Sequence, residues 1–423
     1  MEKTEHSDDS PAARPRWVML NRYSYRRFID AETMTSAASH TSTGHLFRVS
    51  FRLAAPPACS TFHNDWTGSD DEPHRDPEIV AAHGDCLLLD VTCPNPNKMY
   101  DNVVIDYFLY DAAADALSLL AACFFPMTFQ RGDGAGRVAR ARHLWKKDTG
   151  IFHRGSGEVT VAQLEVPDTD DRPKFPRNKA ELCVLDTGRL QWELRRDVPI
   201  VHGEATAGKA YDLMLWWETD VAVPVGDRFL CFVDYFRGFL VYDVAADLAT
   251  VELRYVPLPV EVSDLSPNFD GRPCTASFRN LAGAGIDAVR FVTVESRCCC
   301  GAAGDSSCER GWFLFTVTAW SLNLAATVWV KESMLDCEEL WAMPGYGDLP
   351  RRPLSHPIVS SDDPDIVCFI LLNGYSRYSD EDRDKRKVWM LEINMRSKTL
   401  RSVVLYNNEE QQEEYQIAAK LQF

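Results

Sequence analysis

The sequence predicts an all-β protein in which six antiparallel sheets form the blades of a β-propeller, with few short helices. Three observations predict this fold. Short apolar runs rich in β-branched and aromatic residues recur along the 423 residues, and each is bounded by Gly, Pro, Asn or Asp. A strand–turn–strand unit repeats along the chain. Stretches with helical periodicity are scarce.

The predicted strands follow one another along most of the chain. They include Leu46–Leu53, Cys86–Val91, Val103–Asp111 and residues 181–186, 229–233, 239–244, 289–296, 312–320, 366–372 and 387–393. Only residues 333–341 and 408–423 carry a pattern that a helix could use.

In each repeating unit, an apolar strand ends at a polar turn marker and a second strand follows. The markers are Asp111, Asp186, Asp243, Ser321 and Asn394. Their spacing is irregular and longer than the roughly 40–50 residues of regular propeller repeats, but it leaves room for four strands and a long loop. An N-terminal unit built on Trp17–Leu20 and Leu46–Leu53 completes six blades.

The predicted domain organisation is simple. Residues 1–16 are expected to form a disordered tail, residues 17–406 a single β-propeller-like domain, and residues 407–423 a C-terminal tail or closing segment. The competing architecture is a pair of β-sandwiches. It would need a linker between two cores, and no Gly/Ser-rich or Pro-rich linker stands out.

Composition restricts which classes of partner and which cellular compartment we expect. With 62 acidic and 45 basic residues the net charge is −17, which disfavours nucleic acid and membrane surfaces as partners. The N-terminus lacks the apolar core of a secretory signal, and the apolar stretch 116–125 is too short to span a bilayer. Thirteen irregularly spaced cysteines suit a reducing compartment. We therefore expect a cytoplasmic or nuclear monomer that is not secreted and carries no cofactor.

The stretch GDRFLCFVDYFRGFLVYDV reads as a hairpin without catalytic residues. Gly226 and Asp227 form a turn before the strand 229–233. Asp234 is expected to accept hydrogen bonds from backbone amides of its own turn, and Gly238 to supply a positive φ.

This stretch resembles the signature of the domain of unknown function 1618 family, a plant family expanded in grasses. The residues that carry the resemblance are Gly226, Asp227, Asp234, Gly238, Tyr242, Asp243, Leu258 and Pro259. The clear match covers about residues 216–372, and a looser one covers most of the chain. The resemblance implies no reaction and no active-site residues, so no catalytic residue is assigned.

The same resemblance suggests a distant link to F-box-associated and kelch-like propellers, which bind substrates for ubiquitin ligases. An F-box is a helical module that precedes the propeller. Only residues 1–16 precede the first predicted strand, so we do not expect a self-contained ligase adaptor.

A cysteine-rich loop is the weak candidate for a metal site. Its thiols are Cys298, Cys299, Cys300 and Cys308. Adjacent cysteines cannot all face one tetrahedral ion without strain, and the Cys-x2–4-Cys pairs of structural zinc sites are absent. A loop with incidental thiols is the expected outcome, and a metal-responsive loop is the alternative.

A basic run within Arg131–Lys147 is the candidate for partner binding. Its charged residues are Arg131, Arg137, Arg140, Arg142, Lys146 and Lys147. The run could dock an acidic peptide, a phosphopeptide or RNA, whereas its glycines lack the spacing of a dinucleotide-binding fingerprint. The alternative is a solvated loop that balances nearby acids.

Together these features predict a non-enzymatic module that binds a protein or peptide through loops on one face, with residues 131–147 and 298–311 as the first candidates. The alternative is a hydrolase of sugars or esters whose axial pocket holds two facing carboxylates or a Ser/His pair. The acid pairs Asp170/Asp171 and Asp362/Asp363 are expected to be solvated turns.

Overall fold

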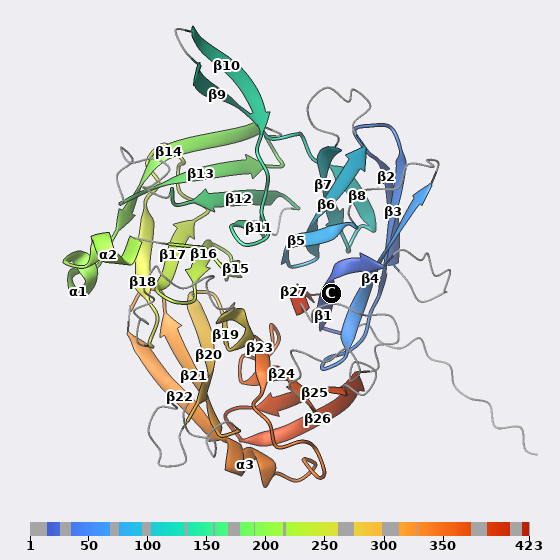
Figure 1. The fold of residues 1–423 in the computed structure, drawn as a ribbon, viewed down its shortest axis with the longest axis vertical. Coiled ribbons are helices and arrows are strands. Elements are labelled where there is room, and N and C mark those ends of the chain that lie inside the picture. The colour runs from blue at the N-terminus through green and yellow to red at the C-terminus, as the bar shows by residue number, and fades with distance from the viewer. Residues whose placement is uncertain are drawn as a thin grey trace, which may run out of the picture.

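The computed structural model confirms the all-β prediction, with strands in nearly every part of the chain that it describes (Figure 1). The structure describes residues 15–25, 35–67, 76–94, 103–131, 134–154, 157–167, 178–189, 191–214, 217–260, 275–297, 313–326, 328–373, 387–406 and 417–422. Side chains at 126–140 and 417–422 are not among those described.

The described strands form one nine-stranded sheet, one eight-stranded sheet, two four-stranded sheets and a two-stranded hairpin. Each of the two large sheets divides into two four-stranded groups, because its halves are joined only by the pairing of Tyr23 with Glu78 in one sheet and of Ile200 and Val201 with Leu253 and Arg254 in the other.

This division gives six four-stranded groups, each largely antiparallel. The first contains β2 (Thr35–His40), β3 (Leu46–Arg52), β4 (Cys59–Thr67) and β1 (Trp17–Tyr25). The second contains β5 (Glu78–His83), β6 (Cys86–Pro94), β7 (Val103–Asp111) and β8 (Ala116–Leu119). The third contains β11 (Thr149–His153), β12 (Val159–Glu165), β13 (Lys179–Asp186) and β14 (Gln191–Val201).

In the first group β1 pairs parallel with β4, whereas the second and third groups are antiparallel and follow the order of the chain. The remaining three groups repeat the order of the second and third. The fourth contains β15 (Val221–Val225), β16 (Phe229–Asp234), β17 (Gly238–Asp243) and β18 (Leu253–Pro257). The fifth contains β19 (Arg279–Gly283), β20 (Ala288–Ser296), β21 (Phe315–Asn323) and β22 (Trp329–Asp336). The sixth contains β23 (Ser355–Val359), β24 (Ile366–Leu372), β25 (Val388–Asn394) and β26 (Thr399–Tyr406).

Three features lie outside this repeat. The last strand, β27 (Ile417–Gln422), pairs antiparallel with β1, so the two ends of the chain share one sheet. A two-stranded hairpin consists of β9 (Phe124–Arg131) and β10 (Gly134–Ala141). The described helices are short, namely α1 (Glu204–Ala207), α2 (Ala210–Met214), η1 (Thr275–Ser277) and α3 (Cys337–Trp341).

The structure corrects both helical stretches of the sequence analysis. Within residues 333–341 only α3 is helical, because residues 333–336 complete strand β22. Residues 417–422 of the second stretch form β27, because their backbone pairs with β1 instead of with itself.

Strands inside the sheets bury both of their faces, which explains why they are continuous apolar runs. Successive residues of a strand point to opposite sides of its sheet. In β16, Leu230 and Phe232 pack in an apolar cluster with the third group, whereas Cys231 and Val233 pack in another with the fifth group. Fully burying one such side chain stabilises the fold by about 1.5–3 kcal/mol.

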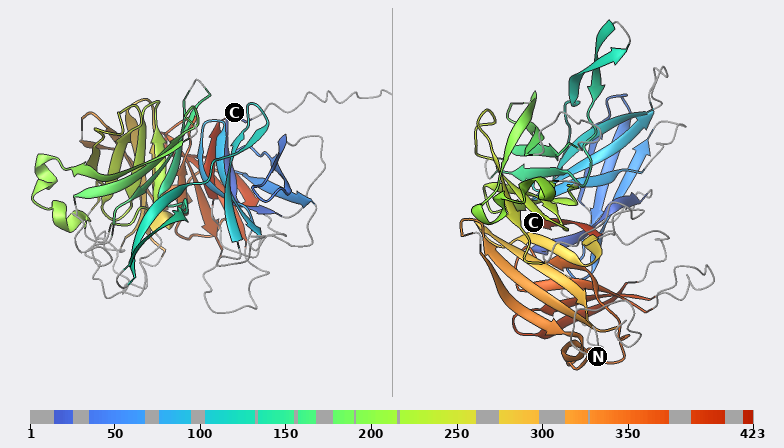
Figure 2. Two further views of the ribbon diagram at one scale, coloured as in Figure 1. Left: turned by 90° about the horizontal axis from the view of Figure 1, so that it is seen from above. Right: turned by 60° about the vertical axis from the view of Figure 1, so that its left-hand side comes forward.

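Six apolar clusters join neighbouring groups among the described residues, and the sixth joins the last group to the first. In that cluster Trp17 and Met19 of β1 pack with Ile358, Cys368 and Ile370. The groups accordingly surround a common centre (Figures 1 and 2), and β5, β11, β15, β19, β23 and β27 lie on the inner side in Figure 1.

Gly238 is required for a different reason from the one that the sequence suggested. Its φ is not among the positive values of the described glycines, so the expected left-handed turn is wrong. A Cβ there would lie 2.4 Å from the Val256 carbonyl oxygen and 2.8 Å from the Tyr255 ring. Gly226 does have a positive φ, of 59°, and its backbone contacts that of Ile286.

Gly238→Ala should therefore lower the free energy of unfolding by about 1–3 kcal/mol, because the added methyl meets a carbonyl that its β-ladder holds in place. The control is Gly208→Ala, which adds a methyl in open space at a φ of −69°. That variant should be unchanged or up to about 1 kcal/mol more stable. Chemical denaturation of both variants measures the difference, and equal stabilities would contradict the steric explanation.

Candidate functional site

The hairpin that carries the family signature is held by its own hydrogen bonds. Asp234 is fully buried, and its Oδ1 accepts from the backbone N–H of Phe236 at 2.8 Å and of Arg237 at 3.2 Å. This is the turn that the sequence predicts. Its Oδ2 accepts from the backbone N–H of Glu218 at 3.2 Å, which ties the turn to the segment before β15.

Other residues of the signature also have structural roles. Burial opposes the charge of Asp243, but hydrogen bonds from Arg228 and from the Ala245 N–H outweigh it and lower the pKa of this carboxyl. Tyr242 and Leu258 are buried in two different apolar clusters. The chemistry of this hairpin is therefore that of a scaffold.

The basic run is a hairpin followed by an anchored segment, and the predicted loop is wrong for most of its length. Arg131 ends β9, and Arg137 and Arg140 belong to β10. The strands pair without interruption from Arg131 with Gly134 to Phe124 with Ala141. In Figure 1 and on the right of Figure 2 this hairpin, here called the arm, extends away from the other sheets.

The base of the arm is fixed to the sheets on both sides. The Arg142 N–H donates to the Cys123 carbonyl at 2.8 Å, so the two strand ends lie side by side. Trp192 of β14 donates from Nε1 to the Ala121 carbonyl at 2.8 Å. The Leu144 N–H donates to the hydroxyl of Tyr107 on β7, also at 2.8 Å. The arm therefore starts from an ordered platform.

Arg142 belongs to the platform and not to the arm. Its guanidinium lies 3.0 Å from the Glu165 carboxylate and 3.5 Å from that of Glu181, and it donates to Gln163. Only 16% of the Arg142 side chain is exposed. Its charge is thus shared among acids of the third group.

Lys146 and Lys147 link neighbouring groups at the amino-terminal ends of their inner strands. Lys146 Nζ lies 2.5 Å from the carboxylate of Glu78 and 3.0 Å from the Tyr23 hydroxyl, joining the segment before β11 to β5 and β1. Lys147 Nζ lies 2.5 Å from the carboxylate of Glu218, which precedes β15. The Glu78 side chain is 3% exposed, whereas that of Glu218 is 44% exposed.

Burial shifts the protonation of other groups near these lysines. It raises the pKa of Asp148 to about 6, although hydrogen bonds from Gln163 and Thr149 favour the carboxylate. It also lowers the pKa of Arg22, whose guanidinium donates to the Ile79 and Val80 carbonyls. Arg22 thus connects the first group to the second, whereas Asp148 is held within the third group.

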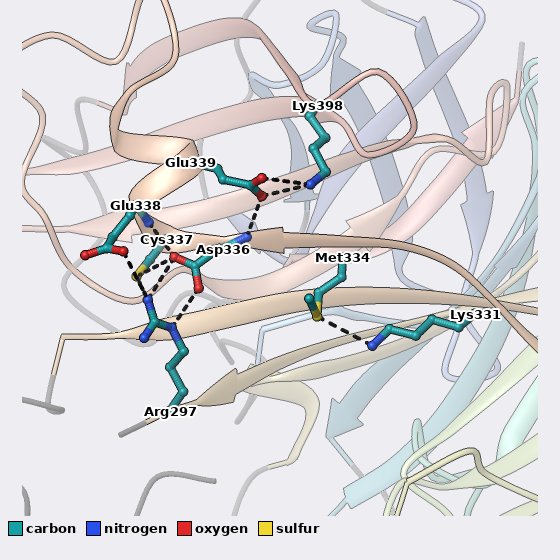
Figure 3. Close-up of polar contacts among 8 residues, drawn as sticks. All are labelled: Arg297, Lys331, Met334, Asp336, Cys337, Glu338, Glu339 and Lys398. Atoms are coloured by element: carbon teal, nitrogen blue, oxygen red, sulfur yellow. Dashed lines mark hydrogen bonds and ion pairs between the residues drawn. The ribbon is translucent and has the colours of Figure 1, made fainter. Parts of the chain in front are cut away.

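The cysteine-rich loop, with Cys298, Cys299, Cys300 and Cys308, lies outside the described residues. The residue just before it is anchored (Figure 3). Arg297 Nε lies 2.7 Å from the carboxylate of Asp336, which also caps α3 in a capping box with Glu339. Glu339 in turn lies 2.8 Å from Nζ of Lys398. Charged contacts thus connect the end of β20, the start of α3 and the turn before β26.

No group of three or more potential metal ligands occurs in the described part of the chain. The cysteines there, eight in number, are all free thiols. Asp170 and Asp171 are not described, while Asp362 and Asp363 lie in a turn where Asp363 accepts from the Asp365 N–H. Within the described ranges, no helix has the length and apolar character needed to cross a bilayer.

The two adjacent lysines provide a matched test of this electrostatic role. Lys146→Met should cost about 2–3 kcal/mol of unfolding free energy, because it leaves the buried carboxylate of Glu78 without its ammonium partner. Lys147→Met should cost less than about 1 kcal/mol, because its pair with Glu218 is solvated. Thermal or chemical denaturation distinguishes the two. Equal losses would show that burial of the partner does not decide the cost.

Comparison with known proteins finds one family model that matches part of the chain. A family model described as "Protein of unknown function (DUF1618)" matches residues 232–368, which confirms the resemblance over that stretch. Plant origin and the link to F-box-associated and kelch-like propellers stay predictions. No curated protein matches the chain.

Several solved structures share a loose likeness. The GH74 xyloglucanase of Xanthomonas campestris is 12% identical, with 91% of this chain and 46% of that one covered and a TM-score of 0.33. Sqt1 of Saccharomyces cerevisiae is 10% identical over 78% and 75%, with a TM-score of 0.32. The α-L-arabinofuranosidase Arb93A of Fusarium graminearum is 9% identical over 84% and 92%, with a TM-score of 0.28. Scores this low carry no functional inference.

Proposed function

We propose that this chain is an intracellular, monomeric six-bladed β-propeller of a plant cell that binds an acidic segment of another polypeptide through the arm. The blade number is supported by the six four-stranded groups and by the apolar clusters that lie between successive groups. Residues 417–422 would close the ring, because β27 pairs with β1 in the first group. Closed rings of this kind present variable connections on a rigid scaffold.

The arm is the observation that carries the binding proposal. Its two strands pair with each other and with no other described strand. A two-stranded hairpin by itself is marginally stable in water, so it gains stability when a partner covers it. The anchored base formed around Cys123 and Arg142 orients the arm, which reduces the entropy lost on binding.

Charge supports an acidic partner. The arm contributes Arg131, Arg137 and Arg140 against the single acid Asp133, in a chain whose net charge is −17. An acidic peptide would be attracted to this segment and repelled by most of the remaining surface. Such complementarity selects the place of contact as well as the partner.

Removal of the arm tests the proposal, because its ends are already adjacent. Deleting residues 124–141 and joining Cys123 to Arg142 through a short Gly-Asn turn should leave folding intact. Binding of a fluorescein-labelled, glutamate-rich peptide, measured by anisotropy, should be lost. In the full chain this binding should weaken as salt is raised, because screening shortens the reach of the charges.

Charge reversal supplies the matched control. The triple variant Arg131→Glu, Arg137→Glu, Arg140→Glu should weaken binding of the peptide at least tenfold. The triple variant Arg189→Glu, Lys209→Glu, Arg401→Glu makes the same change in net charge elsewhere on the exposed surface. It should bind within about twofold of the wild type. Equal losses in the two triple variants, or peptide binding that survives the deletion, would overturn the proposal.

A further inference from the structure

A histidine near the centre of the ring is held in an unusual backbone conformation. His356 lies on the inner strand β23 with a φ of +49°, and it precedes Pro357. The register of β23 against β24 shifts between Ser355 and Ile358, which is a bulge. Left-handed backbone is costly for a residue with a side chain, and bulges redirect side chains next to functional sites.

The bulge places the imidazole of His356 between two serine hydroxyls from different parts of the chain. Nε2 lies 3.3 Å from Oγ of Ser277, at the end of η1 in the neighbouring fifth group. Nδ1 lies 3.2 Å from Oγ of Ser355. The Ser355 hydroxyl donates its proton to the Ile370 carbonyl at 3.4 Å.

The roles of the two imidazole nitrogens depend on the tautomer of His356. The tautomer that lets Ser355 keep its hydrogen bond to Ile370 is the one in which the Ser355 oxygen accepts from Nδ1–H. In this tautomer Nδ1 carries the proton of the neutral ring, and Nε2 holds the free lone pair. The hydroxyl of Ser277 then donates to Nε2. In an activated nucleophile, a serine hydroxyl donates to an imidazole, and a further side chain orients that imidazole. Ser277, His356 and Ser355 have this arrangement.

The surroundings keep the imidazole in the basic form. Burial lowers the pKa of His356, so the ring is neutral near pH 7 and can accept a proton. Ser277 is half-buried, and the next residue, Phe278, has 44% of its surface exposed.

We propose that Ser277 is a nucleophile for small activated carboxylic esters, with His356 as its general base and Ser355 as the positioning residue. Oγ of Ser277 attacks the ester carbonyl and forms a new C–O bond while its proton passes to Nε2. The bond to the leaving alcohol then breaks, and Nε2 returns the proton to that alcohol. In deacylation, Nε2 takes a proton from a water molecule while the water oxygen forms a new bond to the acyl carbon. The bond from that carbon to Oγ then breaks, the carboxylic acid leaves, and Nε2 returns the proton to Oγ.

The neutral hydroxyl of Ser355 behind the imidazole limits the substrate class. A carboxylate behind the imidazole would stabilise the imidazolium that forms during attack, whereas the Ser355 hydroxyl is neutral. Esters with good leaving groups need the least assistance, so they are the class that this site can acylate. This inference stands apart from peptide binding by the arm, which involves other residues.

Acylation by p-nitrophenyl acetate tests the inference directly. Wild-type protein should release nitrophenolate and, when the reaction is stopped with acid during turnover, carry one acetyl group on Ser277, located by peptide mass spectrometry. Ser277→Ala should abolish this modification. His356→Gln should slow it at least about 100-fold, which is the usual contribution of a general base. The control Ser321→Ala removes a hydroxyl that bonds to a carboxylate and should change nothing.

Ser355→Ala separates positioning from binding. It should lower the acylation rate at saturating ester and leave the half-saturating concentration unchanged, whereas a general loss of structure would change both. Mapping on the wild-type protein requires no variant to fold. The inference fails if Ser277 carries no acetyl group, if another residue alone is modified, or if the folded His356→Gln protein reacts at the wild-type rate.

Discussion

The structure depends on one packing constraint, which is that the strands inside each sheet bury apolar side chains on both faces. Val367, Phe369 and Leu371 of β24 pack toward the fifth group, and the alternate residues Cys368 and Ile370 pack toward the first. A sheet with two apolar faces cannot end a stack without exposing one of them to water. The sheets must therefore continue until the last covers the first, and Trp17 and Met19 provide that cover.

Polar contacts between groups are superimposed on this apolar ring, and the candidate chemistry lies among them. Lys146 with Glu78, Lys147 with Glu218 and Ser277 with His356 each connect segments that precede or begin inner strands of neighbouring groups. The arm leaves the ring between β8 and β11 without interrupting a cluster, because its two ends meet at Cys123 and Arg142. The arrangement of sheets thus accommodates both the arm and the polar pairs between groups.

Much of the fold could be predicted from the sequence because apolar runs such as residues 229–233 form strands locally, and the turn at Asp234 depends on near neighbours. The arm could not be predicted, since its glycines and arginines lack the alternation of apolar and polar residues that indicates a strand. The polar pairs between groups could not be predicted either, because their members are far apart in the sequence. Lys146 is 68 residues from Glu78, and Ser277 is 79 residues from His356. The role of Gly238 depends on Val256, across a strand pair.

Closure of the ring can be measured at an ion pair that spans its two ends. Arg16, just before β1, lies 3.7 Å from the carboxylate of Asp362, in the turn between β23 and β24. In an Arg16→Lys variant, a zero-length carbodiimide should join the introduced amine to the Asp362 carboxylate within single molecules, and Asp362→Asn should remove that link. Absence of the link from the monomer, or its formation only between molecules, would contradict a ring in which the first and last sheets meet.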